Sequence, residues 1–184
     1  MAGVKGNRRV LYTKKIIKES LIDLLQYKKI HEVTVTDICK KSDINRGTFY
    51  AHYKDTYDLL KSLEDELFNQ ILEYIEEIPV EDYKDILLLK ALELIEKNKE
   101  LCKILFSKQM ENNIVDRIIY IASKSKIDKL VSNSKVVDAA FLDYFIKYSV
   151  GGVVSVVQTW LENDLKESPK EIVNIINDII TFHP

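Results

Sequence analysis

Residues 43–55, with the sequence DINRGTFYAHYKD, combine three aromatic side chains with one arginine, one histidine and one lysine. Aromatic residues this close together are typical of a hydrophobic core, because each buries a large apolar surface. The guanidinium of Arg46, the imidazole of His52 and the ammonium of Lys54 instead favour water or phosphate. The segment is therefore a piece of core, an active site or a surface that contacts another molecule, and residue types alone leave all three open.

The distribution of charge favours a surface that contacts a polyanion. Residues 1–54 contain 12 Lys and Arg against 5 Asp and Glu, a net charge of +7. Residues 55–184 contain the other 15 basic residues against 24 acidic ones, a net charge of −9. Such asymmetry indicates that the basic part meets a polyanion, and a merely solvated lysine-rich face is the alternative. Three of the four arginines, Arg8, Arg9 and Arg46, lie in the basic part, and arginine suits bidentate contacts with phosphate and guanine.

The surrounding pattern predicts three helices that would position this segment. From Thr13 onward apolar residues recur at helical spacing and form one face. That face consists of Ile17, Leu21, Leu24 and Leu25. Thr34 with Asp37 three residues later predicts a capping box that opens a second helix. Asp43 tolerates the left-handed backbone of a tight turn, and Asn45 is a good N-cap for a third helix. Two short helices joined by a turn of about four residues form a helix-turn-helix.

The rest of the chain predicts an all-α fold of about nine helices. Five glycines and three prolines in 184 residues are few, which favours long helices over turns and strands. A fourth helix is expected to begin near Asp55 and to end before Pro79. Between Val136 and Leu161 the chain is apolar on nearly every face, and the terminal helix carries another wide apolar stripe. Helices of this kind must be covered on several sides.

These last two helices are too apolar for a monomer's surface, so we expect a homodimer in which they form a four-helix bundle. Gly151 and Gly152 cost a helix about 1 kcal/mol each relative to alanine, and the close approach of a neighbouring backbone would compensate. The predicted interface residues are Val150, Gly151, Gly152, Val154, Val157, Ile172, Ile176 and Ile179.

No constellation of catalytic residues is recognisable. The three histidines, at positions 31, 52 and 183, have no metal-ligand spacing with each other or with the two cysteines, Cys39 and Cys102. A glycine-rich phosphate loop and a nucleophile elbow are both missing. We therefore expect no enzyme, no cofactor and no metal. The longest uncharged stretch, residues 148–161, has 14 residues, short of the roughly 18 that suggest a membrane span, so a soluble cytoplasmic protein is expected.

Residues 34–60, TVTDICKKSDINRGTFYAHYKDTYDLL, resemble the helix-turn-helix of the TetR family of bacterial transcriptional regulators, with its Thr-Phe-Tyr core at Thr48, Phe49 and Tyr50. Residues 145–172, FIKYSVGGVVSVVQTWLENDLKESPKEI, are similar to the C-terminal region of a TetR subgroup common in Gram-positive bacteria. The resemblance implies a DNA-binding domain with a basic arm at residues 1–54 and an effector-binding and dimerisation domain at residues 55–184.

A recognition helix in the major groove places its donors at its N-terminal turns. Arg46 would read guanine, Gly47 would let the backbone approach the bases, and the hydroxyls of Thr48 and Tyr50 would bind phosphates or base edges. The predicted DNA-binding residues are Thr34, Thr36, Asn45, Arg46, Gly47, Thr48, Tyr50, His52 and Lys54. Phe49 and Tyr53 share the other face and are expected in the core.

Two residues depart from the family pattern. The turn residue that is usually glycine is Asp43, which places an acid near the DNA. The place of a phosphate-binding lysine at the start of the fourth helix is occupied by Thr56, so Lys54 would have to make that contact.

The resemblance further implies a ligand-responsive repressor that binds a palindromic operator as a dimer, with an unknown small-molecule effector. The candidate pocket residues are Phe106, Tyr120, Phe141, Tyr144, Tyr148 and Trp160, although aromatic residues at helical spacing are also typical of plain core. The alternative is a co-activator that acts through a protein partner and has a vestigial helix-turn-helix. Asp43 and Thr56 favour this alternative, and the charge of +7 opposes it.

Overall fold

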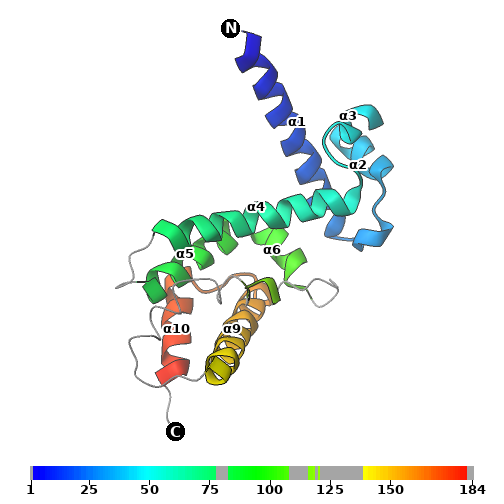
Figure 1. Cartoon of the computed structure of the whole chain (residues 1–184). Helices are drawn as coiled ribbons and strands as arrows, with labels where there is room; N and C mark the ends of the chain where they lie inside the picture. Colours follow the sequence, from blue (N-terminus) through cyan, green and yellow to red (C-terminus); the bar gives the residue numbers. More distant parts are fainter. Residues whose placement is uncertain (1, 78–82, 108–115, 119, 121–138, 182–184) are drawn as a thin grey trace. The chain divides into compact units, whose positions relative to one another are not determined.

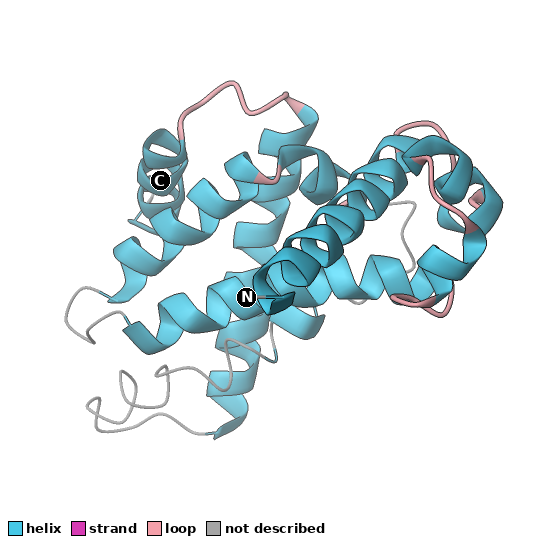
Figure 2. Ribbon diagram, turned by 90° about the horizontal axis from the view of Figure 1, so that it is seen from above, coloured by secondary structure: helices cyan, strands magenta, loops and turns pink. Residues whose placement is uncertain are grey.

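The computed structural model describes residues 2–77, 83–107, 116–118, 120 and 139–181. Across these ranges it contains eight α-helices, one short 3₁₀ helix and no strand, which confirms the expected all-α fold (Figures 1 and 2). The chain divides into two compact units, Met1–Leu67 and Phe68–Pro184. The helices of the described part include none with the length and apolar composition needed to cross a membrane.

The first unit contains α1 (Ala2–Leu25), η1 (Ile30–Glu32), α2 (Val35–Ser42), α3 (Arg46–Tyr50) and the first turns of α4 (Thr56–Glu77). Helix α1 packs against α2, and α2 against α3. The core that joins them is formed by Ile17, Leu21, Leu24, Val33, Ile38, Phe49, Tyr53, Leu59, Leu60, Leu63 and Leu67.

Helix α1 begins at Ala2 rather than at Thr13, which corrects the expected start. The earlier residues 8–12 are all exposed, so they contribute no buried face. Since apolar periodicity reports only a face that packs, it cannot detect helical residues that are exposed, such as these. Arg8 and Arg9 are exposed on this extension, which stands clear of α2 and α3 (Figure 1).

The predicted local signals all appear at the ends of the helices. Thr34 caps α2, its hydroxyl oxygen accepting from the backbone N–H of Asp37 at 3.1 Å, while Asp37 accepts from the N–H of Thr34 at 3.1 Å. These bonds to Thr34, with one from Lys28, hold the pKa of Asp37 below its ordinary value. Asp43 ends α2 in the left-handed conformation, with φ 51° and ψ 47°. The carboxylate of Asp55 accepts from the N–H of Asp58 at 2.8 Å and caps α4.

The boundary between the two units falls within α4, whereas the sequence placed it before that helix, between residues 54 and 55. The reason lies in the first turns of α4, where Leu59, Leu60, Leu63 and Leu67 are all buried. These residues complete the core of the first unit, so its compact part extends beyond the predicted boundary.

The second unit contains the end of α4, α5 (Tyr83–Lys97), α6 (Lys99–Leu105), α9 (Ala139–Glu162) and α10 (Pro169–Thr181). Helix α10 packs against α5, and α6 packs against α9. The predicted apolar run began at Val136, and residues 136–138 lie outside the described part.

Trp160 is 1% exposed, and its indole N–H donates to the carbonyl oxygen of Glu167 at 2.8 Å. This bond closes the turn between α9 and α10, where Asp164 and Leu165 have φ of 63° and 58°. Lys99 and Lys103 of α6 hold the carboxylate of Asp164 at 2.7 Å and 2.6 Å. Because two consecutive non-glycine residues in the left-handed region are costly, these contacts help to fix the turn.

Candidate nucleic-acid interface

The N-terminal turn of α3 is held by its cap. The side-chain oxygen of Asn45 accepts from the backbone N–H of Thr48 at 2.8 Å and from the Thr48 hydroxyl at 3.1 Å. This confirms Asn45 as the N-cap of the third helix. Asn45 and Thr48 therefore use part of their hydrogen-bonding capacity on each other, and Thr48 is half-buried. Their structural role is to shape the turn that presents Arg46.

Arg46 is exposed and bonded to α2. Its guanidinium donates to the hydroxyl oxygen of Thr36 at 2.6 Å, which joins the first turns of α2 and α3. Both side chains lie on the surface, so a single bond sets the direction of the arginine while leaving its other donors available. The free Cys39 is buried, and burial raises the pKa of its thiol, while the nearby charge of Arg46 acts in the opposite direction.

Gly47 follows Arg46 and is exposed. A Cβ added at this position would lie 3.2 Å from the side-chain oxygen of Asn45, closer than ordinary van der Waals contact. The glycine therefore leaves room for the side chain of Asn45, which caps α3. This role is separate from any approach of the backbone to DNA. The sequence suggested only close backbone approach to the bases, and this intrahelical reason was not anticipated.

The aromatic residues of α3 and of the turn that follows it differ in burial, as expected. Phe49 is fully buried and Tyr53 is 6% exposed, whereas Tyr50 is 56% exposed. The rings of Phe49 and Tyr50 meet edge to face, with 5.6 Å between their centroids. Burial raises the pKa of the Tyr53 phenol, although a hydrogen bond with the side chain of Ser62 on α4 acts in the opposite direction. Phe49 and Tyr53 thus anchor the helix and leave the Tyr50 hydroxyl near solvent.

The three residues beyond α3 have different environments. His52 is half-buried, with its ring centroid 6.4 Å from that of Tyr53. Lys54 is exposed, and its backbone N–H donates to the carboxylate of Asp58 at 3.0 Å. Thr56, in the position where the family often has a lysine, is only 6% exposed and cannot replace that lysine at a surface. Lys54 remains available for a phosphate, and Asp43 is exposed in the turn before α3.

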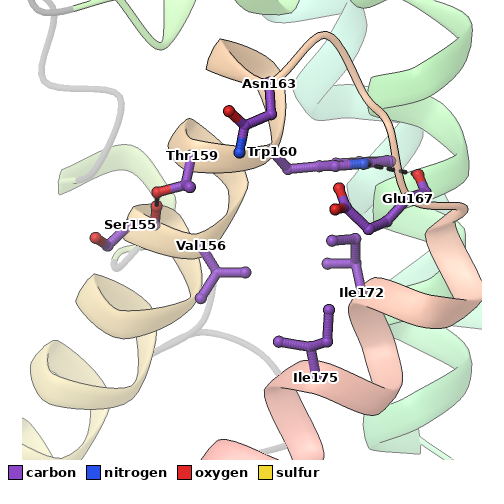
Figure 3. Close-up of a pocket in the computed structure, with 8 residues that line it drawn as sticks. All are labelled: Ser155, Val156, Thr159, Trp160, Asn163, Glu167, Ile172 and Ile175. Atoms are coloured by element: carbon purple, nitrogen blue, oxygen red, sulfur yellow. Dashed lines mark hydrogen bonds between the residues drawn. The ribbon is translucent and has the colours of Figure 1, made fainter.

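The six aromatic residues expected to line a ligand pocket differ widely in burial. Phe106 and Trp160 are buried in the core of the second unit. Four others are largely exposed, namely Tyr120 at 61%, Phe141 at 60%, Tyr144 at 74% and Tyr148 at 84%. A shallow pocket of about 260 Å³ lies instead between α9 and α10 (Figure 3). Its lining residues are Ser155, Val156, Thr159, Trp160, Asn163, Glu167, Ile172 and Ile175.

The eight residues predicted at a dimer interface also differ in burial. Four of them are already buried within the chain and have little surface left for a partner; these are Val154, Val157, Ile172 and Ile176. Sequence periodicity could not distinguish a face covered by the chain itself from one covered by a second copy. Val150 is half-buried, Ile179 is 58% exposed, and Gly151 and Gly152 are exposed.

Sequence reasoning missed two features of these sites. Thr36 was expected to contact DNA directly, but its bond to Arg46, ten residues away across a turn, has no signature in the sequence. Ser155 and Thr159 were not singled out, although they lie on the exposed side of an otherwise apolar helix. The sequence signal that could have identified Ser155 and Thr159 is the occurrence of two small polar residues at helical spacing. Among the residues that the structure covers, no cluster of three or more His, Cys, Asp or Glu could hold a metal ion.

An all-helical chain with a capped helix-turn-helix in a basic N-terminal unit has the architecture of a DNA-binding regulator. Residues 81–182, more than half of the chain, match the model for the C-terminal region of TetR-type transcriptional regulators. The chain therefore belongs to the TetR family of transcriptional regulators, and the proteins that it matches are regulators rather than enzymes, in line with the expectation from the sequence.

Two curated relatives match part of the chain. The HTH-type regulator YxbF of Bacillus subtilis is 31% identical over 70 residues, which are 38% of this chain and 18% of YxbF. DhaS of Lactococcus lactis, the transcriptional activator of the dhaKLM operon, is 29% identical over 65 residues, 35% of each protein. The chain thus spans well under half the length of these relatives in the matched segments.

Solved structures agree in fold over nearly the whole chain. A TetR transcriptional regulator from Streptococcus agalactiae has a TM-score of 0.69 at 21% identity, covering 98% of this chain and 99% of that one. The fatty acid degradation regulator FadR from Bacillus halodurans has a TM-score of 0.67 at 15% identity, covering 91% and 94%. Identities this low establish the shared fold alone.

Proposed function

We propose that the protein is a homodimeric, ligand-responsive repressor that inserts α3 into the major groove at each half of a palindromic operator. The observation that carries this proposal is the arrangement of Arg46, which is exposed at the first turn of α3 and directed by Thr36. A recognition helix reads bases from this turn. The surrounding segment, residues 1–54, has a net charge of +7, which suits the phosphate backbone.

In this proposal the contact residues have separate roles. Arg46 reads a guanine through its remaining donors, and the Tyr50 hydroxyl binds a phosphate or a base edge. His52 and Lys54, which follow the C-terminal end of α3, bind phosphates. Thr34 and Thr36 lie at the exposed first turn of α2. Asn45, Gly47 and Thr48 act mainly by fixing the geometry of the turn. This division is supported by the cap bonds and by the space beside Gly47.

A dimer follows from the proposed operator, since two recognition helices must reach half-sites about one helical turn of DNA apart, ~34 Å. Large exposed apolar residues on α9 and α10 support it. Large exposed apolar patches on a protein surface often mark an interaction site. An effector that prefers one separation of the recognition helices would then control binding.

The test is binding to the DNA upstream of the protein's own gene, measured by gel shift at two salt concentrations. We expect specific binding that weakens as salt rises. The Arg46→Ala/Tyr50→Ala variant should lose specific binding and remain a dimer. A matched control is Tyr57→Ala/Lys61→Ala, because it also removes an exposed tyrosine and one positive charge four residues apart. Equal binding by wild type and the α3 variant would contradict the assignment of the contact surface.

A second candidate function is activation of transcription through a protein partner. It is favoured by the similarity to DhaS, which is named as an activator, and by Asp43 and Thr56 as departures from the usual contact residues. A reporter fused to the upstream DNA separates the two candidates: deletion of the gene should raise expression under a repressor and lower it under an activator.

A further inference from the structure

The positive charge of the first unit is concentrated at its beginning. Residues 1–18 contain six Lys and Arg and no acidic residue, a net charge of +6. Residues 19–54, which include α2 and α3, contain six basic residues against five acidic ones, a net charge of +1. Nearly all of the charge that suits a polyanion therefore belongs to the first part of α1 rather than to the helices of the helix-turn-helix.

The basic residues around α2 and α3 are partly neutralised within the chain. Lys28 lies 3.2 Å from the carboxylate of Asp37, and Lys41 lies 2.9 Å from that of Asp23. Because the two charges of each pair largely cancel at a distance, the pair attracts a phosphate only weakly. The surface around Arg46 therefore supplies little of the electrostatic attraction on which binding to DNA depends.

Arg8 and Arg9 are in the opposite situation. Both are exposed on α1, and neither takes part in a hydrogen bond or ion pair within the described ranges of the chain. Tyr12, which is 66% exposed, lies one turn beyond Arg8 on the same face of the helix. The fully buried Ile17 anchors α1 in the core, and Arg9 precedes it by eight residues, about 12 Å of helix. The arginines therefore project beyond the core of the first unit.

The direction of α1 places these arginines on the side of the unit that carries α3. In Figure 1, α1 lies on the same side of the first turns of α4 as α2 and α3, and its N-terminal part points away from α4. Packing on α2 fixes the position of α1, as does the contact of Lys18 with Glu66 on α4. Because α1 is one unbroken helix from Ala2 to Leu25, the arginines have a defined position relative to α3.

We propose that the exposed part of α1 is a second DNA-binding element, which binds the phosphate backbone beside the base pairs that α3 reads. Arg8 and Arg9 bind phosphates, and the hydroxyl of Tyr12 supplies a further donor. Phosphate contacts carry no sequence information, so this element supplies affinity and salt dependence while α3 supplies discrimination between sequences. This inference rests on the proposed function and adds a contact surface to it.

DNA fits this part of α1 better than an anionic membrane does. A helix that lies on a membrane combines a basic face with a continuous apolar face that enters the lipid. The exposed apolar residues among positions 8–12 are Val10, Leu11 and Tyr12, which are consecutive and therefore point about 100° apart around the helix. They form no continuous apolar face, so charge is the property that selects the partner.

The salt dependence of binding tests the second element. Arg8→Ala/Arg9→Ala removes four arginines from a dimer on its operator, so the slope of log K against log salt concentration should decrease in magnitude by about 3–4. Affinity should fall about tenfold or more at low salt, and by a similar factor for the operator and for unrelated DNA. Arg8→Lys/Arg9→Lys keeps the charge and should retain the wild-type slope. Fluorescence anisotropy over a series of salt concentrations measures both quantities.

Two matched variants distinguish this role from other effects of charge. Lys166→Ala/Lys170→Ala removes the same number of charges from exposed positions of the second unit and should leave the slope unchanged. Arg46→Ala should reduce the ratio of operator affinity to non-specific affinity, whereas Arg8→Ala/Arg9→Ala should leave this ratio as in the wild type.

Tethered cleavage locates the element without depending on charge. An iron chelate attached to the Arg9→Cys variant should cut the DNA backbone in each half of the operator, next to the bases that α3 protects. The native thiols of Cys39 and Cys102 are buried and should react little with the chelate.

The outcomes separate the two proposals. A wild type without specific operator binding would contradict the proposed function, and with it the second element. Specific binding with an unchanged slope in Arg8→Ala/Arg9→Ala, or without cleavage from position 9, would overturn only the second element. A loss of specificity as large as that of Arg46→Ala would assign base contacts to α1 and overturn its role at phosphates. Binding to phosphatidylglycerol vesicles that the variant loses, with an unchanged slope on DNA, would assign the arginines to a lipid surface.

Discussion

The two units differ in how far along the sequence their longest polar contacts reach: 48 residues in the first unit, between Lys18 and Glu66, and 92 residues in the second, between Asn177 and Asp85. The bonds that shape the helix-turn-helix join residues close in sequence: three apart in the caps by Thr34, Asn45 and Asp55, and ten apart between Thr36 and Arg46. In the second unit, the side chain of Gln158 donates to the carbonyl oxygen of Phe106, 52 residues away. The contact between Lys103 and Asp164 spans 61 residues, and that between Asn177 and Asp85 spans 92.

This difference indicates what each unit needs from the rest of the chain. The helix-turn-helix is specified largely by caps and turns that form locally, with a small core that fixes their arrangement. The second unit acquires its shape from contacts that form only when distant helices have already packed. In the proposed homodimer, the apolar residues that the second unit leaves exposed add a further dependence, on a second copy.

The largest effect is expected from removing the anchor of the local unit. Phe49 is fully buried, so Phe49→Ala should destabilise the first unit by about 3–5 kcal/mol and abolish operator binding. The second unit should keep its dimer contacts, because Phe49 belongs to the other unit. Urea unfolding followed by circular dichroism, with sedimentation for the dimer, measures both. The neighbouring Tyr50→Ala is the matched control, since it removes a similar ring that is 56% exposed and should change stability little.

A loss of the dimer in Phe49→Ala would contradict the independence of the two units, because it would show that the second unit depends on the first. Retained operator binding would show instead that the position of α3 does not depend on this anchor.

The locality of the first unit explains why its sequence was informative. Capping at Thr34 and Asn45, the left-handed turn at Asp43 and the burial of Phe49 and Tyr53 each follow from residues within a few positions. What the sequence could not supply was the extension of α1 to Ala2, in which residues 8–12 are exposed, and the bond from Arg46 to Thr36.

The second unit was predictable in class but not in detail. Apolar residues all round α9 correctly predicted a long helix, yet they did not reveal which side the chain itself covers. That side depends on α6, which packs against α9 from a distant part of the sequence. Val154 and Val157 therefore proved to be internal, while Tyr144 and Tyr148 proved to be exposed.

A smaller effect is expected from the one contact of the recognition turn that spans α2 and α3. Thr36→Val removes the hydroxyl that accepts from Arg46. Loss of one hydrogen bond worth about 1 kcal/mol should weaken operator binding about fivefold and reduce discrimination at the base that Arg46 reads. Thr36→Ser keeps the hydroxyl and should bind as wild type does. Fluorescence anisotropy with operators altered one base pair at a time measures both effects. A loss in Thr36→Ser that Thr36→Val does not share would instead assign the effect to the threonine methyl group, which valine keeps and serine lacks.

A still smaller change, of opposite sign, is expected at Asp43. Asp43→Asn keeps a residue that tolerates φ 51° but removes an exposed negative charge beside α3. Binding should tighten by about two- to fivefold at low salt, and the gain should shrink as salt is raised, since it comes from exposed charges. Anisotropy at two salt concentrations is the measurement. A gain that is independent of salt would contradict an electrostatic cause.

The smallest effect concerns the long-range contacts of the second unit. Hydrogen bonds and charges from Lys103 and Lys99 lower the pKa of Asp164 to about 2, from an ordinary value of 3.8. A carboxylate with a lowered pKa stabilises the folded state above its unfolded pKa, and this stabilisation is lost as pH falls from about 4 to about 2. Wild type should therefore lose thermal stability in this window more steeply than Asp164→Asn, which also tolerates the left-handed φ of 63°. Because the Asp164 side chain is 71% exposed, the difference should be small. Melting temperatures at pH 2–6 test it, and parallel curves would show that the turn between α9 and α10 is held by Trp160 and its bond to Glu167 without help from the lysines.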